Sequence, residues 1–205
     1  MTTEASPERP IRSAATSRTT KETSIEASLV IDGSGQTDVS TGVPFYDHML
    51  DQIGRHASFD LVVKTTGDVH VDAHHTVEDT AIVLGELFAQ AIGNKAGVRR
   101  FASGLYPLDE ALVEVAVDLS GRPYFVWNVE LPESIPLGTP PFDPSLAEHV
   151  FQSFATAAGI TLHITMRDGR NVHHIIEAAF KGVARCLRDA VRIEGTDVPS
   201  TKGSL

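Results

Sequence analysis

The chain has 205 residues, of which 41% are hydrophobic and 21% charged, so its composition is that of an ordinary globular protein. This length suffices for one domain or for two small, closely packed ones. The formal net charge of -10 argues against a broad nucleic-acid-binding surface, and no apolar run approaches the length that spans a membrane. The single cysteine, Cys186, falls on an apolar helix face, which predicts a packed thiol and a cytoplasmic protein.

Local patterns along the chain predict the following elements. Residues 1–17 are rich in Thr, Ser, Ala and Pro without periodicity, so we expect a disordered N-terminal tail. Alternating or β-rich patterns predict strands at residues 25–31, 61–65, 112–119, 124–129 and 160–166. The proline-rich residues 131–145 predict a surface loop, and residues 194–205 form a polar C-terminal tail.

A motif of the form His-His-x-x-Glu occurs twice. The two copies are His74-His75-x-x-Glu78 and His173-His174-x-x-Glu177, which lie 99 positions apart. The apolar positions after each motif keep the same offset, with steps of three and four residues typical of an amphipathic helix. We therefore predict an α+β tandem duplication with pseudo-two-fold symmetry, in which residues 18–95 and 105–193 each form a sheet followed by a long helix.

The start of each predicted helix indicates how its histidines are used. Asp72 and Asn171 are suitable N-caps, which places both histidine pairs in a first turn, where the helix dipole disfavours a protonated imidazole. Adjacent helical side chains diverge by about 100°. The two histidines of a pair are therefore predicted to serve two separate metal sites.

Matching residues upstream extend the repeat. His48 and His149 are 101 positions apart, and Glu22 pairs more loosely with Glu110 at an offset of 88. The predicted metal ligands are six histidines and two glutamates, or three histidines and one glutamate per site: His48, His74, His75, Glu78, His149, His173, His174 and Glu177. Nitrogen and oxygen ligands of this kind suit Mn, Fe, Co, Ni or Zn, and spacing alone does not choose among them.

From Arg18 onward the chain resembles imidazoleglycerol-phosphate dehydratases. The residues that carry the resemblance are 45–50 (FYDHML), 72–79 (DAHHTVED), 120–123 (SGRP), 173–181 (HHIIEAAFK) and 199–203 (PSTKG). The resemblance implies a ribosomal protein S5 domain 2-like fold and dehydration of D-erythro-imidazole glycerol phosphate to imidazole acetol phosphate in histidine biosynthesis. It also implies two Mn(2+) ions per active site and a homo-oligomer of 24 subunits with active sites at subunit interfaces.

The implied reaction removes a proton beside a hydroxyl group, so the substrate's imidazole ring must act as the electron reservoir. Metal ions on both ring nitrogens would hold the ring as imidazolate, which could expel the hydroxyl and give a diazafulvene. A carboxylate would then take the proton from the adjacent carbon. The resemblance singles out Glu22 as this base, and Glu177 also lies near the ring if it binds metal.

The resemblance further implies a set of substrate-binding residues. Arginine and lysine suit the phosphate group, and the tail over residues 194–205 would close on the active site as a lid. The expected substrate-binding residues are Glu22, Gln52, Arg100, Arg122, Lys181, Ser200 and Lys202.

Two other classes of function use similar residues. A binuclear hydrolase of phosphate esters would need the same ligand types and cations, although it usually relies on several aspartates and this ligand set has none. A metal-storing or metal-sensing protein would need neither phosphate-binding cations nor a glutamate outside the ligand set. Metal ions that hold subunits together are compatible with catalysis.

Overall fold

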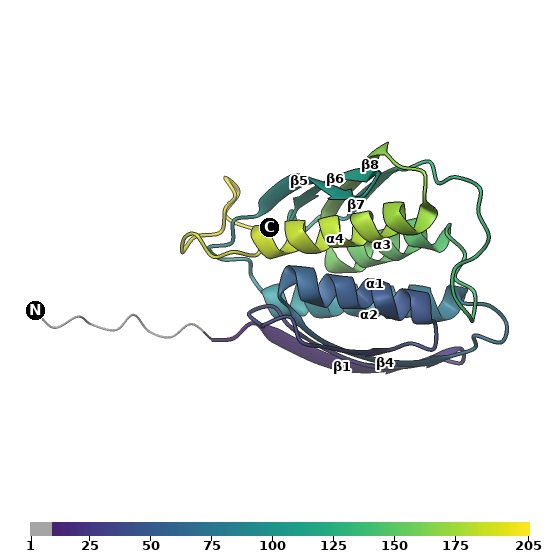
Figure 1. Ribbon diagram of the computed structural model, residues 1–205. Helices are drawn as coiled ribbons and strands as arrows, with labels where there is room; N and C mark the ends of the chain where they lie inside the picture. Colours follow the sequence, from purple (N-terminus) through teal and green to yellow (C-terminus); the bar gives the residue numbers. More distant parts are fainter. Residues whose placement is uncertain (1–9) are drawn as a thin grey trace, which may run out of the picture.

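The computed structural model describes residues 10–205 of the protein, and the expected tail at residues 1–9 lies outside this range. Within the described residues, two four-stranded sheets form the outer layers, and helices fill the space between them (Figure 1). The first sheet has the order β1-β2-β4-β3, from strands β1 (Ser13–Thr19), β2 (Thr23–Val30), β3 (Thr37–Ser40) and β4 (Asp60–Gly67). The second has the order β5-β6-β8-β7, from β5 (Phe101–Leu108), β6 (Ala111–Asp118), β7 (Tyr124–Asn128) and β8 (Thr161–Asp168).

The two halves have the same topology, which confirms the predicted α+β duplication. In each sheet two strand pairs are antiparallel and the last pair, β3 with β4 or β7 with β8, is parallel. The helices are α1 (Pro44–Ala57), α2 (His74–Ile92), α3 (Leu146–Ala158) and α4 (Val172–Ala190). Over the part of the chain that the structure describes, none of the helices is both long and apolar enough to traverse a lipid bilayer.

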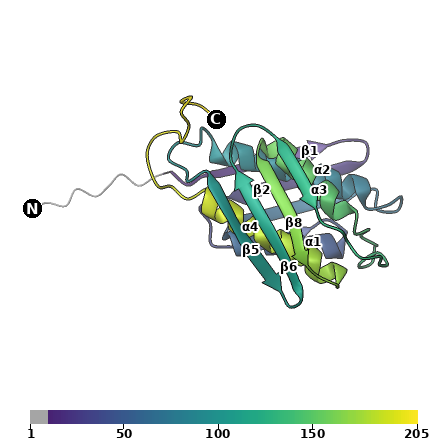
Figure 2. The same cartoon turned by 90° about the horizontal axis from the view of Figure 1, so that it is seen from above.

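Side-chain alternation explains why each sheet has one buried face. In β2 the side chains of Ile25, Ala27 and Leu29 are buried while their neighbours point outward, as expected for a strand with one face on the core. Seen from above, the sheet of β5 to β8 lies across α4 and α3 (Figure 2). Helix α1 packs against α4 and α2 packs against α3, so each helix pair joins the two halves.

The structure corrects several element predictions. Ser13–Thr19 form β1, so the predicted tail is wrong for residues 13–17, and the unpredicted strand β5 begins at Phe101, before the predicted start of the second repeat at residue 105. Strand β3 and helices α1 and α3 were not predicted either. The two strands β1 and β3 were not predicted because they are edge strands with few apolar side chains. Backbone pairing with β2 or β4 holds them in place.

The predicted loop before α3 is present but is not entirely at the surface. Phe142 is fully buried and its ring lies 5.1 Å from the ring of Phe45 on α1. The prediction that Cys186 is packed is confirmed, since it is buried in α4, and burial raises the pKa of its thiol to about 11.

Candidate metal centre and substrate site

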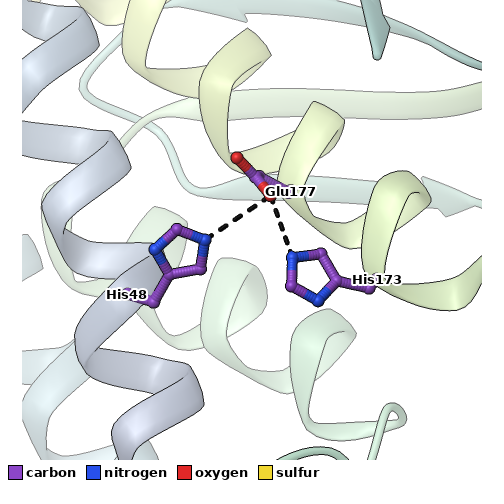
Figure 3. A group of neighbouring side chains, drawn as sticks. All are labelled: His48, His173 and Glu177. Carbon is purple, nitrogen blue, oxygen red and sulfur yellow. Dashed lines mark hydrogen bonds and ion pairs between the residues drawn. The ribbon is translucent and has the colours of Figure 1, made fainter. Parts of the chain in front are cut away.

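One group of potential metal ligands joins α1 to α4. His173 and Glu177 lie one turn apart on α4, and His48 projects toward them from α1 (Figure 3). Glu177 Oε2 is 3.0 Å from His173 Nε2 and 3.5 Å from His48 Nε2. One donor atom from each residue lies within 4.8 Å of the other two. We call this group the α1/α4 triad.

A second group has the same composition and joins α2 to α3. In this α2/α3 triad, Glu78 is 3.1 Å from His149 Nε2 and 3.7 Å from His74 Nε2, and its three donor atoms also lie within 4.8 Å of one another. Within residues 10–205, His149 Nε2 is buried without a well-formed hydrogen bond, despite the nearby carboxylate. Two imidazoles and a carboxylate that converge in this way fit a divalent transition-metal ion.

Each triad combines residues from both halves of the chain. The upstream histidine of the first half, His48, joins the helix motif of the second half, and His149 of the second half joins the motif of the first. Six of the eight predicted ligands therefore lie in two triads, with two histidines and one glutamate each. His75 and His174 lie outside both triads, and their ring centroids are 6.1 and 6.2 Å from those of the preceding histidines.

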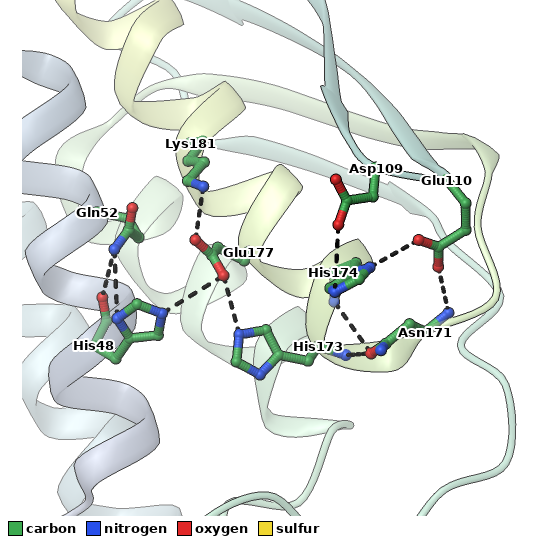
Figure 4. Close-up of polar contacts among 9 residues, drawn as sticks. All are labelled: His48, Gln52, Asp109, Glu110, Asn171, His173, His174, Glu177 and Lys181. Atoms are coloured by element: carbon green, nitrogen blue, oxygen red, sulfur yellow. Dashed lines mark hydrogen bonds and ion pairs between the residues drawn. The ribbon is translucent and has the colours of Figure 1, made fainter.

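His75 and His174 each contact a carboxylate that was not predicted as part of the site. Asp68 Oδ2 is 3.0 Å from His75 Nδ1, and Glu110 Oε2 is 2.7 Å from His174 Nδ1 (Figure 4). These hydrogen bonds raise the pKa of both imidazoles, which is opposite to the effect predicted from the helix dipole. The hydrogen bond with His174, followed by those from two backbone amides, lowers the pKa of Glu110 to about 2.

The two helix starts differ slightly from the prediction. Asn171 is the N-cap of α4 as predicted, and its side chain accepts hydrogen bonds from the N–H groups of His173 and His174. Helix α2 has Ala73 at its N-cap, one residue after the predicted Asp72. The Asp72 carboxylate still accepts the N–H of His74 at 2.8 Å, so both histidine pairs lie in a first turn.

Comparison with known proteins gives the family. A family model described as imidazoleglycerol-phosphate dehydratase matches residues 41–187. An imidazoleglycerol-phosphate dehydratase of Acidothermus cellulolyticus is 59% identical over 196 residues, which cover 95% of this chain and 93% of the relative. The chain belongs to the imidazoleglycerol-phosphate dehydratase family. It is accordingly a hydro-lyase that dehydrates imidazole glycerol phosphate in histidine biosynthesis.

Further relatives and solved structures of the dehydratase family agree with this assignment. An imidazoleglycerol-phosphate dehydratase of Roseobacter denitrificans is 52% identical over 198 residues, 95% of this chain and 100% of the relative. The crystal structure of the dehydratase from Staphylococcus aureus has a TM-score of 0.79 at 35% identity, covering 88% of this chain and 99% of that chain. The structure from Pyrococcus furiosus has a TM-score of 0.76 at 34% identity, covering 93% and 100%.

In this dehydratase, four of the predicted substrate-binding residues gather in one open cleft beyond the C-terminal end of α4: Arg100, Arg122, Ser200 and Lys202. Arg100 forms a two-point ion pair with Asp118, and its Nη1 donates to the carbonyl oxygen of Pro199 at 2.8 Å. The backbone of Arg100 is anchored to α4, since its N–H donates to the carbonyl oxygen of Ala190. The cleft is therefore cationic and partly formed by the C-terminal tail.

The other three predicted residues of the dehydratase site lie near the metal triads. Lys181 Nζ is 2.6 Å from Glu177 Oε1, so it lies beside the α1/α4 triad rather than in the cationic cleft. Gln52 Nε2 is 3.4 Å from His48 Nδ1. Glu22 Oε1 is 3.9 Å from His75 Nε2. The sequence alone did not indicate a role for Asp68 or Glu110. The pairing of Glu110 with Glu22 at an offset of 88 was, however, a sign that Glu110 occupies an equivalent position in the second half.

Proposed function

We propose that this dehydratase works with two Mn(2+) ions at each active site, one held by each triad. The observation that carries the proposal is the presence of two equivalent groups of imidazole and carboxylate donors, each within 4.8 Å, with one further histidine next in sequence to the helix histidine of each group. Three ligands from one chain leave room at an octahedral ion for that further histidine and for substrate. The proposed ligands are the two triads together with His75 and His174.

The bound metal ions would supply Lewis acidity that stabilises the imidazolate form of the substrate ring. The protein's own groups then have to orient the ring and move protons. We place departure of the hydroxyl first, giving a diazafulvene, and removal of the proton from the adjacent carbon second. The resulting enol becomes the ketone of imidazole acetol phosphate, and the balance of the reaction is the loss of one water molecule.

We assign proton removal to Glu22. This carboxylate is half-exposed at the turn before β2, and its Oε1 atom is 3.9 Å from His75 Nε2. Because Glu22 is not one of the proposed metal ligands, it is free to approach a substrate held beside His75. Glu177 touches the same reaction centre as a ligand. Although burial by itself raises the pKa of Glu177, its hydrogen bond and ion pair with Lys181 outweigh this and lower it, which suits a metal ligand better than a base.

We further propose that subunits share each active site in a homo-oligomer, of 24 subunits if it follows the family resemblance. The backbone N–H of Arg100 is hydrogen-bonded to the carbonyl oxygen of Ala190 at the end of α4, whereas Glu177 is near the start of that helix. The helical rise puts these positions about 20 Å apart. That span exceeds the length of an imidazole ring with a phosphorylated glycerol chain, which supports a site whose metal ions and phosphate-binding cations come from different chains.

In this proposal the cationic cleft of one chain binds the substrate's phosphate beside the triads of another. Arg100, Arg122 and Lys202 supply positive charge, and Ser200 supplies a hydroxyl donor. The tail over residues 194–205 closes on the site when the phosphate is bound. Gln52 and Lys181 lie beside the α1/α4 triad, where they would contact the ring end or the hydroxyls of the substrate. A cytoplasmic setting suits an enzyme of amino-acid biosynthesis.

The test is turnover of imidazole glycerol phosphate by metal-stripped protein before and after addition of Mn(2+). We expect activity only after the addition. In Glu22→Gln we expect turnover to fall by about 100-fold or more, as for loss of a general base, while manganese content stays that of the wild type. Glu26→Gln, which changes an exposed glutamate on β2, is the matched control.

Three results would contradict the proposal. If metal analysis shows that the protein holds no metal and its activity is nevertheless full, manganese is not needed for the reaction. Unchanged turnover in Glu22→Gln would show that a residue other than Glu22 removes the proton. Hydrolysis of simple phosphate esters by the manganese-loaded protein, without dehydration, would instead favour the binuclear hydrolase.

A further inference from the structure

The two halves of the chain place a glutamate at the same structural position. Glu22 directly precedes β2 and Glu110 directly precedes β6, each at the turn of a hairpin whose strands pair in the same way. Each faces the second histidine of its half, but at a different nitrogen. Glu22 is 3.9 Å from His75 Nε2, whereas Glu110 is 2.7 Å from His174 Nδ1. Their side chains also differ in exposure, 52% for Glu22 and 24% for Glu110.

The Glu110 carboxylate is fixed at both oxygens. Oε1 accepts the backbone N–H groups of Asn171 at 2.8 Å and Arg170 at 3.3 Å, and Oε2 faces His174 Nδ1 (Figure 4). A carboxylate only accepts hydrogen bonds, so the proton of a neutral His174 must lie on Nδ1. The Nε2 atom then carries the free lone pair, and its nearest carboxylate oxygen, Asp109 Oδ2, is 4.0 Å away.

We propose that Glu110 is a positioning residue for metal binding, which holds His174 in the tautomer and orientation that present Nε2 to a metal ion. The proposal rests on the proposed function, in which His174 is a ligand. Carboxylates that accept the second ring N–H of a metal-binding histidine commonly set its tautomer and raise its basicity. Glu110 therefore carries a different role from its structural counterpart Glu22.

The first half assigns the same task to a different residue. Asp68, which follows the end of β4, contacts His75 Nδ1 and leaves Glu22 free at the Nε2 side of that ring. Gly169 is the counterpart of Gly67, since Cβ atoms at these two positions would meet Ile175 and Thr76, which are equivalent residues of α4 and α2. The counterpart of Asp68 is therefore Arg170, a basic residue, and the hairpin glutamate of the second half contacts the histidine instead.

Amide variants separate these two carboxylates. In Glu110→Gln the single side-chain oxygen has to stay with the backbone N–H groups of Arg170 and Asn171, since the reverse orientation sets donor against donor. The amide NH2 group then faces His174 Nδ1, which must become an acceptor, and the proton moves to Nε2. In Asp68→Asn no such conflict arises, because within residues 10–205 Asp68 Oδ1 has no hydrogen-bond partner.

The experiment titrates Mn(2+) into metal-free wild-type protein, Glu110→Gln and Asp68→Asn by calorimetry. For Glu110→Gln we expect one class of site to weaken by about 100-fold and the other to stay as in the wild type. For Asp68→Asn we expect a weakening of about tenfold or less, because a neutral acceptor replaces a charged one without changing the tautomer. Ring-nitrogen NMR of the metal-free proteins reads the tautomer of His174 directly, with His174→Gln to assign its signal.

The results can be separated from those that test the proposed function. If the wild type binds no manganese, the metal centre itself is wrong, and this inference falls with it. If the wild type binds two classes of ion but Glu110→Gln binds both as tightly, or weakens them equally, the positioning role is overturned while the dehydratase mechanism stands. An Nδ1-protonated His174 in Glu110→Gln would overturn the tautomer argument even if that variant were less stable.

Discussion

At the scale of single residues, Asn171 connects helix stability to the geometry of the site. Its side chain accepts the N–H groups of His173 at 2.9 Å and His174 at 3.4 Å. We expect Asn171→Ala to lower the free energy of unfolding of the metal-free protein by about 1 kcal/mol, the usual cost of losing an N-cap. Asp72→Ala, which removes one backbone contact at α2, should cost less. Urea denaturation measures both, and an equal or absent effect would contradict the cap's role.

The residue types of the site could be predicted from the sequence, but their partners could not. The repeated motif identified the histidines and glutamates because a helical register fixes which side chains share a face. It did not show that His48 meets Glu177 or that His149 meets Glu78, because that depends on which helices pack together. The role of Glu110 was equally hidden, since it contacts a histidine 64 positions away.

At the scale of elements, Gly85 sets how closely α2 approaches α3. A Cβ atom at this position would lie 2.6 Å from the carbonyl oxygen of Phe154 and 2.7 Å from the Cβ of Ala157. Exchanging glycine for alanine inside a helix usually stabilises it by about 1 kcal/mol. For Gly85→Ala we expect the opposite, a loss of about 1–3 kcal/mol in the free energy of unfolding, because backbone atoms have to move.

Chemical denaturation of the metal-free protein checks this prediction, with Glu86→Ala as the matched control. Glu86 is the exposed neighbour on the same helix, so its replacement should change stability by no more than about 0.5 kcal/mol. A more stable Gly85→Ala variant would mean that α2 and α3 can separate without cost.

Most central elements were visible in the sequence, whereas the edges of the sheets were not. Strands β2, β4, β6 and β8 have one face on the core, so their apolar side chains mark them. Strand β5 includes Gly104 and Pro107, which weaken its strand pattern, yet it pairs with β6 along its whole length. Helices α1 and α3 were not predicted because, at 14 and 13 residues against 19 for α2 and α4, they have fewer apolar positions to mark a helical period.

At the scale of the whole molecule, the proposed assembly follows from the separation of the metal triads from the cationic cleft. In the proposed assembly the metal ions lie in the site that subunits share, so we expect chelation of the metal ions to dissociate the assembled protein. Addition of Mn(2+) should restore the larger species. Light scattering during size-exclusion chromatography measures the mass, and Glu22→Gln should assemble as the wild type does. An unchanged mass after complete metal removal would show that protein contacts alone hold the subunits together.

The exchange of ligands between halves bears on how the chain arose. A half chain by itself would carry an upstream histidine and a His-Glu pair that point to different triads, and it could complete neither. Two copies facing each other would complete both triads, from which we infer that an ancestral half chain worked as a dimer. Fusion through residues 93–100 made that pairing independent of concentration. It also let the two copies evolve separately. The different contacts of Glu22 and Glu110 with the histidines of their halves are consistent with such divergence.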